Sequence, residues 1–335
     1  MKTQVFSLSI SGRMVLDMHS LNNEGGEGNQ ITTRMVNIVY NDPENKQPRL
    51  ASVNAISGDM LKHIMSEHLY LQAKTDSLPL CEGCKKFSAS RAADDDDLVK
   101  ELLKNTNSEA IDKLLEKCVL DDIAGNLIAP KGKKRTLPRK SIAEFGWVIG
   151  LPEITRTESY FHVRYATEMG MSEEKKDGDQ EQQQKLEQPI FHRPASSGIY
   201  AIVATFELAR IGFNDIKQEY AIGQEEREKR YQALLKSILY TFIEPNGAMR
   251  GTQNPHILGF SGALTISKQV IPAPTLSPLD SDYLNDLKRV VNALNKTKED
   301  SITVHEFDSL GKFAEIMSDL ISETSPYKLF DQKGG

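Results

Sequence analysis

Residues 3–34 read TQVFSLSISGRMVLDMHSLNNEGGEGNQITTR, and this stretch decides the fold. From position 6 to position 18 its even positions are apolar apart from Gly12, while its odd positions include serines, an arginine and an aspartate. This period of two predicts a strand over residues 3–18 with one core face and one polar face. Gly12 marks an expected bulge or bend. We expect the strand at the centre of a sheet, followed by a glycine-rich loop that ends in Arg34.

The rest of the chain adds strands and helices with insertions between them. Periodicity and turn residues predict strands at 35–40, 50–56, 197–211 and 257–266, a hairpin from 144–150 and 159–166, helices at 57–73 and 224–243, and a helix, strand and helix within 282–323. The βαββαβ order indicates an α+β fold of the ferredoxin-like or RNA-recognition type with an antiparallel central sheet. In that topology the first and third core strands lie side by side.

No linker divides the 335 residues, so we expect one elaborated domain, 1–335. Within it we expect a helical insertion over 74–130, which contains an acidic helix at 98–117, and C-terminal helices over 282–330. A Glu/Lys/Gln-rich segment at 173–188 is of low complexity. No apolar run reaches the ~20 residues of a membrane helix, and no signal-peptide core opens the chain. A cytoplasmic protein without membrane partners is therefore expected.

The net charge of −6 hides an uneven distribution. Residues 131–164 hold eight lysines and arginines against three glutamates, and local charge is what binding to a polyanion requires. The exposed basic loop at 130–141 has two interpretations, a solvated linker or a contact to a nucleic-acid backbone.

Ser57 and Gly58 open the helix expected at 57–73, with Lys62 one turn further on. Ser57 is a favourable N-cap, and the amides of such a start favour an anion such as phosphate. Plain capping is the alternative interpretation.

Three cysteines, Cys81, Cys84 and Cys118, do not make a disulfide framework. A tetrahedral zinc site needs a fourth ligand, for which His68 is the candidate, with His63 as the alternative. The sequence leaves two interpretations open, a structural zinc or reduced and partly buried thiols. No other cofactor is indicated.

Several stretches together resemble the DevR-type CRISPR-associated autoregulator family, the backbone RAMP proteins (the seventh Cas group) of type I Cascade complexes. The resemblance covers roughly the first 215 residues in order and extends to about residue 267. It lies in ISGR, GNQITTR, VNAISGDMLKHIMSEHL, the CVLDDIAGNLIA to LPRKS run, ITRTESYFHVRYA, SSGIYAIVATFELARIG and GALTIS.

The resemblance implies a modified RNA-recognition (RAMP) fold with a thumb loop at 166–194, where Met169, Met171 or Phe191 supplies an apolar wedge. It implies a backbone subunit that polymerises along CRISPR RNA, with target DNA, copies of itself and other Cascade subunits as partners. The polar face of the opening strand suits a track for the RNA backbone. The candidate RNA-binding residues are Arg13, Asn22, Arg34, Ser57, Gly58, Lys62, Lys133, Lys134, Arg135, Arg156, His192, Arg193 and Arg250.

No nucleophile set, phosphate-binding loop or dinucleotide fingerprint is present in the sequence. Related backbone subunits of type III complexes cut RNA with an aspartate in an early loop, whereas Asp17 ends the opening strand and residues 19–34 hold no aspartate. We therefore expect no cleavage. A metal-dependent ribonuclease of the type III kind and a stand-alone DevR-like regulator are the alternatives.

Overall fold

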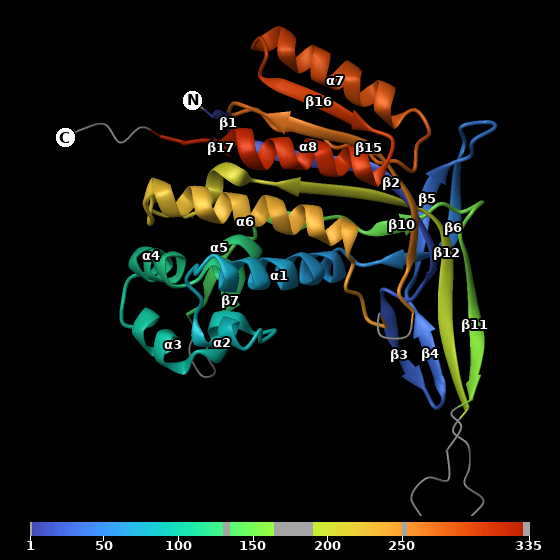
Figure 1. Ribbon diagram of the computed structural model, residues 1–335, viewed down its shortest axis with the longest axis horizontal. Coiled ribbons are helices and arrows are strands. Elements are labelled where there is room, and N and C mark those ends of the chain that lie inside the picture. Colours follow the sequence, from blue (N-terminus) through green and yellow to red (C-terminus); the bar gives the residue numbers. More distant parts are fainter. Residues whose placement is uncertain (1, 130–134, 164–189, 250–252, 331–335) are drawn as a thin grey trace, which may run out of the picture.

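The computed structural model describes residues 2–129, 135–163, 190–249 and 253–330. Its main feature is a sheet of eleven strands among these residues, ordered β16-β15-β2-β12-β10-β6-β5 along its main path. Figure 1 shows helices α1, α6 and α8 lying together along this sheet, and a panel of long strands that projects beyond it. None of the helices within the described ranges is both long and apolar enough to cross a membrane.

Strand β2 (Ser7–His19) lies at the centre of the sheet, as predicted. It pairs antiparallel with β12 (Ile190–Phe206) on one side and with β15 (His256–Ser267) on the other, which confirms that the first and third core strands are neighbours. The bulge expected at Gly12 is absent from both registers. Gly12 instead permits close strand approach, because a Cβ there would lie 2.9 Å from the carbonyl oxygen of Ser261.

The remaining strands extend the sheet on both sides. β16 (Ile302–Phe307) pairs with β15, whereas β9 (Ala143–Phe145) and β10 (Val148–Gly150) pair with β12. β6 (Pro48–Ile56) follows β10 and pairs antiparallel with β5 (Met35–Asn41), which confirms the two strands predicted at 35–40 and 50–56. The hairpin expected from 144–150 and 159–166 is wrong, because β11 (Arg156–Val163) pairs with β12 along its whole length.

Three long helices cover the apolar face of the sheet. α1 (Gly58–Thr75), α6 (Gln224–Ile243) and α8 (Leu310–Glu323) bury leucine, isoleucine and aromatic side chains against β2 and β15. The rings of Phe242 and Phe260 stack 4.9 Å apart, and Phe313 packs against both. α7 (Tyr283–Thr297) packs beside β16. The helix, strand and helix predicted within 282–323 are thus confirmed.

The helical insertion forms a lobe below α1 (Figure 1). It consists of α2 (Glu82–Lys85), a 3-10 helix (Arg91–Asp94), α3 (Asp96–Leu102), α4 (Asn107–Lys117) and α5 (Val119–Ala124), followed by the small ladder of β7 (Asn126–Ile128) and β8 (Leu137–Arg139). The single helix predicted at 98–117 is split, because Thr106 and Glu109 form a capping box that starts α4 anew.

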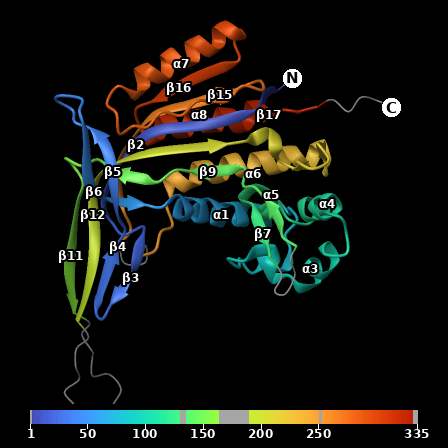
Figure 2. The same cartoon turned by 180° about the vertical axis from the view of Figure 1, so that it is seen from behind.

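The strand panel consists of two strand pairs that lie side by side, β3 (Asn23–Glu27) with β4 (Gln30–Thr33) and β11 with the first part of β12 (Figure 2). β3 and β4 form a hairpin where the sequence predicted a loop, and β4 touches β12 at the His192–Gln30 pair. β12 begins in this panel against β11 and continues into the main sheet beyond an irregularity at 196–198. The strand panel therefore places the β3–β4 hairpin, which ends just before Arg34, beside β11 and β12.

Short elements complete the described chain. β1 (Thr3–Val5) pairs parallel with β17 (Thr324–Pro326), and β13 (Phe213–Asn214) pairs with β14 (Glu219–Tyr220) after a 3-10 helix at Leu208–Arg210. Most of the expected thumb at 166–194, with Met169 and Met171, lies outside the described residues, as does the side chain of Phe191.

Candidate nucleic-acid interface

The start of α1 is built as the sequence predicted. Ser57 is the N-cap, and its Oγ accepts a hydrogen bond from the amide of Met60 at 3.2 Å. Gly58 is required at the next position, because a Cβ there would lie 2.2 Å from the carbonyl oxygen of Phe145. The helix start is therefore pressed against the end of β9.

Asn22 joins the Arg34 hairpin to this helix start. Its Oδ1 accepts a hydrogen bond from the amide of Ser57 at 2.7 Å, and its carbonyl accepts one from the amide of Arg34 at 3.2 Å. The side chain of Thr33 also donates to the same carbonyl. Asn22 is buried, so these bonds are shielded from water. The structure thus brings together three predicted RNA-binding positions that lie far apart in sequence.

Arg34 lies half-exposed at the surface of this junction. Its Nε is 2.9 Å from Oε1 of Glu24, with which it forms an ion pair. The guanidinium carbon lies 5.8 Å from the centre of the Trp147 ring, within the range of a cation–π contact. Trp147 is 42% exposed. A cation on an exposed aromatic ring can hold a phosphate and stack a base at once, although Glu24 competes for the same cation.

The sequence interpretation missed Trp147. It is the single tryptophan of the chain, and it stands between β9 and β10 next to Gly146. A single tryptophan beside a glycine was the available signal, but only the tertiary structure shows that it is exposed and meets Arg34.

Buried polar side chains lie next to the backbone of Arg34. The amide of Asn54 donates to the carbonyl of Arg34 at 3.0 Å, and its Oδ1 accepts from the hydroxyl of Tyr200 at 2.8 Å. The ring of His19 packs edge-on against Tyr200 at 4.9 Å. Burial lowers the pKa of His19 to about 4, so the ring is neutral near pH 7. Its Nε2 has no hydrogen-bond partner among the described residues.

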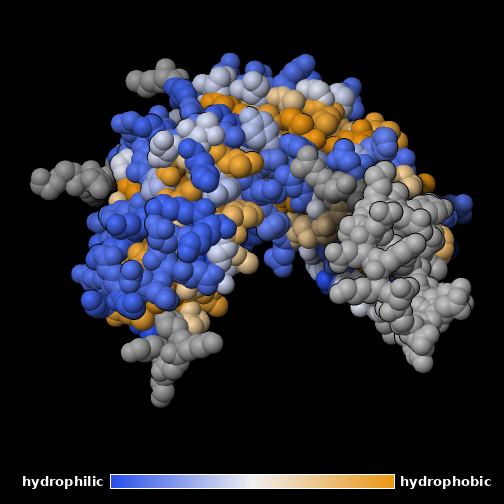
Figure 3. Space-filling model, turned by 60° about the horizontal axis from the view of Figure 1, so that its bottom comes forward, coloured by the Kyte–Doolittle hydropathy of each residue, from blue (hydrophilic) through white to orange (hydrophobic). Residues whose placement is uncertain are grey.

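Lys62 lies in a separate hollow of about 240 Å³ between α1 and the insertion. Arg91 lines the same hollow and donates to the carbonyls of Ala124 and Gly125. Burial and the nearby Arg91 guanidinium lower the pKa of Lys62. Two cations therefore converge here. Figure 3 shows that the lower side of the molecule is hollowed near its centre.

Three further candidates lie on the strand panel. Arg156 is exposed at the start of β11, and its guanidinium donates to the carbonyl of Thr155. The amide of His192 donates to the carbonyl of Asn29 at 2.9 Å, which ties β12 to the tip of the β3–β4 hairpin. The Nε of Arg193 is buried and has no partner among the residues that the structure describes.

The basic residues of the 131–164 run do not form one patch. Nε of Arg135 donates to Oδ1 of Asn107 at 2.8 Å on the insertion, a lobe remote from the strand panel in Figure 1. Arg139 is buried and pairs with Asp122 at 2.8 Å, so it is part of the core. Candidates Lys133, Lys134 and Arg250 lie outside the described residues.

The expected RNA track on the polar face of β2 is wrong for its serines. Segment 268–282 covers this face, and its prolines favour an irregular path over a further strand. The serines are buried and hydrogen-bond to the backbone of that segment; they are Ser7, Ser9 and Ser11. Nε of Arg13 donates to the carbonyl of Pro278 at 2.8 Å, so its guanidinium already has protein partners.

The three cysteines meet in the insertion, as the zinc interpretation required. Cys81, Cys84 and Cys118 are buried together with Asp121, and the four potential ligand atoms lie within 4.8 Å of one another. Burial raises the pKa of the Cys118 thiol and raises that of Asp121 to about 8. His68 is not part of this cluster, because its Nε2 lies 2.9 Å from the carbonyl oxygen of Glu244.

Comparison with protein families matches residues 10–288 to the CRISPR-associated negative auto-regulator DevR/Csa2 family. CRISPR-associated protein Cas7/Csa2 1 of Saccharolobus solfataricus is 23% identical over 334 residues, which cover 98% of this chain and 93% of that protein. CRISPR-associated protein Cas7/Cst2/DevR of Methanocaldococcus jannaschii is 22% identical over 326 residues, which cover 94% of this chain and 99% of that protein.

Solved structures of CRISPR complexes are also similar. A chain of a "CRISPR RNA-guided surveillance complex, pre-nicking" aligns with a TM-score of 0.48 and 12% identity, covering 97% of this chain and 96% of that chain. A chain of a "CRISPR RNA-guided surveillance complex" aligns with a TM-score of 0.43 and 9% identity, covering 94% and 98%. The family match spans most of the chain and confirms the resemblance drawn from the sequence motifs. This protein is a member of the DevR/Csa2 family of CRISPR-associated proteins.

Proposed function

We propose that this protein is a non-catalytic backbone subunit of a type I Cascade effector complex. Copies of it polymerise along a CRISPR RNA and hold the guide by its phosphates, while the bases stay available for pairing with target DNA. The observation that carries this proposal is the junction of Asn22, Arg34 and Ser57 beneath the exposed ring of Trp147, found in a member of a CRISPR-associated family.

The junction suits an RNA of any sequence. A guide that varies from one complex to the next must be held through its phosphates and sugars, which cations and backbone amides contact without reading the bases. Arg34 supplies the cation, the start of α1 supplies a favourable helix dipole, and Trp147 offers a sequence-tolerant stacking surface. Asn22 fixes the spacing between them.

We propose that the fold is the modified ferredoxin-like RAMP fold. The strand order supports this. Across the sheet of a βαββαβ unit the strands stand in the order four, one, three, two. Here β15, β2, β12 and the β9–β10 pair occupy these four places in turn. Helices α1 and α6, which pack together, take the places of its two crossover helices. The insertion and the strand panel are additions to that unit.

Purification under native conditions tests the proposal. The full chain is expected to elute as an oligomer with high absorbance at 260 nm from bound RNA. The double variant Arg34→Ala and Lys62→Ala is expected to lose that RNA, because both cations are removed. Arg289→Ala is the matched control, since Arg289 is 81% exposed on α7 in an ion pair with Asp286. A wild-type monomer free of nucleic acid would contradict the proposal and favour a stand-alone DevR-like regulator.

The absence of cleavage is a separate part of the proposal. Asp17 lies within β2 opposite His256, on a strand and not on a loop. We expect no cutting of target RNA in a manganese-dependent assay. Cutting by the wild-type chain that Asp17→Ala abolishes would show instead a ribonuclease of the type III kind.

A further inference from the structure

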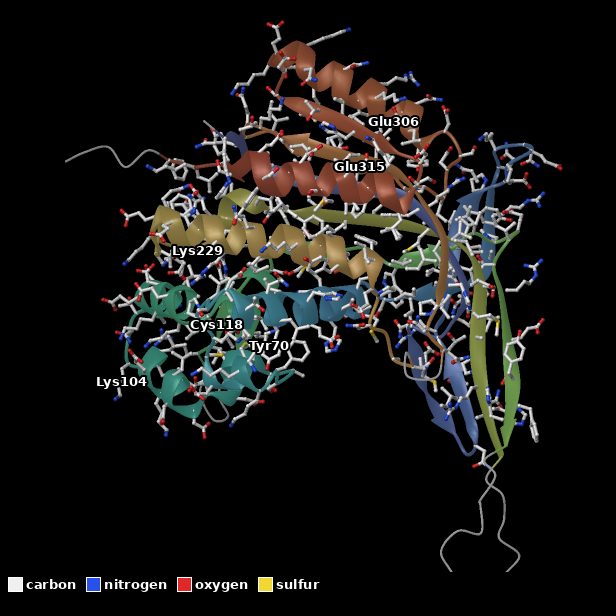
Figure 4. The ribbon with its side chains drawn as sticks, in the orientation of Figure 1. Tyr70, Lys104, Cys118, Lys229, Glu306 and Glu315 are labelled. Carbon is white, nitrogen blue, oxygen red and sulfur yellow. The ribbon has the colours of Figure 1, made fainter. Side chains whose placement is uncertain are left out.

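The insertion is closed at its base by a compact group of metal-ligating side chains. Cys81 and Cys84 lie at the start of α2, where the insertion begins, whereas Cys118 and Asp121 lie at the start of α5, where it returns to the core. Cys118 lies on the side of α1 that faces the insertion (Figure 4). This is the one group of three or more such side chains within reach of a single ion in the part of the chain that the structure describes.

The spacing of the four groups fits a tetrahedral ion. Oδ2 of Asp121 lies 3.3 Å from Sγ of Cys81 and 3.5 Å from Sγ of Cys84. A tetrahedron with metal–sulfur bonds of ~2.3 Å and metal–oxygen bonds of ~2.0 Å has sulfur–oxygen edges of ~3.5 Å. These two distances match the edges of a bound ion, and all four ligand atoms lie within 4.8 Å of one another.

Neighbouring groups already orient the carboxylate of Asp121. Its Oδ1 accepts hydrogen bonds from the side-chain amide of Asn126 at 2.6 Å and from the backbone amide of Ala92 at 3.3 Å. These bonds leave Oδ2 directed at the sulfurs. Such outer partners that fix a ligand are usual around protein-bound metals.

Two consecutive buried aspartates at this point of the chain have different partners. Asp122 is fully buried and pairs with Arg139 at 2.8 Å and with Arg230 at 2.9 Å. Asp121 is equally buried, but among the described residues it forms no ion pair and faces thiols. The ionised form of this buried carboxylate has no positive partner among the described residues, and a cation bound to Oδ2 would supply one.

We propose that Cys81, Cys84, Cys118 and Asp121 bind a zinc ion that clamps the two ends of the insertion. Three sulfurs and one oxygen in a tetrahedron select zinc over oxygen-preferring ions such as magnesium or calcium. Binding displaces the thiol protons to solvent and links α2 to α5. Cys81 lines an open hollow of about 720 Å³, which gives the ion a route from solvent.

The ion would hold the insertion against α1. Tyr70 points from α1 toward α2 (Figure 4), and its hydroxyl donates to the carbonyl of Lys85 at 3.1 Å. Lys85 directly follows Cys84, so the metal and this hydrogen bond fix the same turn. The hollow that contains Lys62 and Arg91 lies at the same boundary between α1 and the insertion. The clamp thus also positions that pair of cations.

Metal analysis of the purified full chain tests the proposal without any RNA. Protein made with zinc in the medium is expected to contain about one zinc per chain, with an X-ray absorption spectrum of three sulfurs and one oxygen at the metal. Cobalt exchanged into the site is expected to give thiolate charge-transfer bands and the visible bands of a tetrahedral ion. A reduced, folded chain that retains neither zinc nor cobalt would overturn the proposal, as would a Cys81–Cys84 disulfide in freshly prepared protein.

Variants identify the ligands. Cys84→Ser and Asp121→Asn are expected to lower the zinc content at least about fivefold, whereas Glu82→Gln, an exposed acid next to Cys81, keeps it. His68→Gln is also expected to keep the metal, because His68 lies outside the cluster. Loss of zinc from His68→Gln but not from Asp121→Asn would overturn the assignment of Asp121. If the ligand variants do not fold, the sulfur and oxygen count from the wild-type spectrum decides.

Discussion

The strand panel and the insertion lobe both carry arginines, but they use them in different ways. Arg34 in the panel lies at the surface on Trp147, with one exposed carboxylate beside it. Arg139 at the base of the lobe is buried between Asp122 and backbone carbonyls of the core. Charge in a sequence therefore does not by itself identify an RNA contact. Only an arginine whose guanidinium can reach a ligand qualifies.

The largest expected effect is on the buried arginine. Arg139→Gln leaves Asp122 with one arginine in place of two, so the free energy of unfolding should fall by about 3–5 kcal/mol. Urea denaturation measures this change. Lys140→Ala, an exposed neighbour, should change the same quantity by less than ~0.5 kcal/mol. Equal losses in both variants would contradict the distinction between the two regions.

His19 beneath Arg34 should make stability depend on pH. Its pKa is about 4 in the folded chain and 6.5 when unfolded, so the unfolded chain binds the proton first as pH falls. The free energy of unfolding is therefore expected to fall by about 3 kcal/mol between pH 6.5 and 4 through this group alone.

Denaturation at several pH values checks this prediction. His19→Gln should flatten the slope in that window relative to wild type, whereas the exposed His256→Gln should leave it unchanged. Parallel slopes for wild type and His19→Gln would show that His19 is not buried in its neutral form.

Trp147→Ala should weaken guide binding by about tenfold, because stacking of a base on an aromatic ring contributes ~1–3 kcal/mol. The folded chain should lose little stability, since the ring is already 42% exposed. Fluorescence anisotropy with labelled CRISPR RNA measures the affinity, and Trp147→Phe, which keeps a stacking face, should recover most of it. Unchanged affinity in Trp147→Ala would remove the ring from the interface.

The smallest effect concerns the helix start. Ser57→Ala removes the cap on the amide of Met60 and should cost about 1 kcal/mol of unfolding free energy. Thermal unfolding measures it. Ser57→Thr keeps the hydroxyl and should stay close to wild type, and a full loss in that variant would mean that the hydroxyl is not what stabilises the start of α1.

Local patterns predicted the elements that periodicity controls. β2, α1 with its Ser57 cap, α6 and β15 all appear within a few residues of their expected bounds. The three cysteines also meet, as the zinc interpretation required. These features depend on side-chain alternation, capping and ligand type, which are readable along a single chain.

Contacts between distant segments could not be predicted in this way. The serines of β2 seemed open because nothing in their own stretch shows that the proline-containing segment 268–282 folds over them. Asp121 replaces His68 near the cysteines because α5 brings it there, some 40 positions from Cys81. Trp147 reaches Arg34 across the sheet for the same reason. Each case depends on tertiary packing.

The affinity of Arg34→Ala for CRISPR RNA, measured over a range of salt concentrations, tests the central claim most directly. We predict a loss of about tenfold or more, with a salt dependence shallower by about one unit in slope, because one phosphate contact is lost. Arg289→Ala should bind within about twofold of wild type, since that arginine lies on α7, away from the strand panel. A correctly folded Arg34→Ala with wild-type affinity and slope would contradict the account.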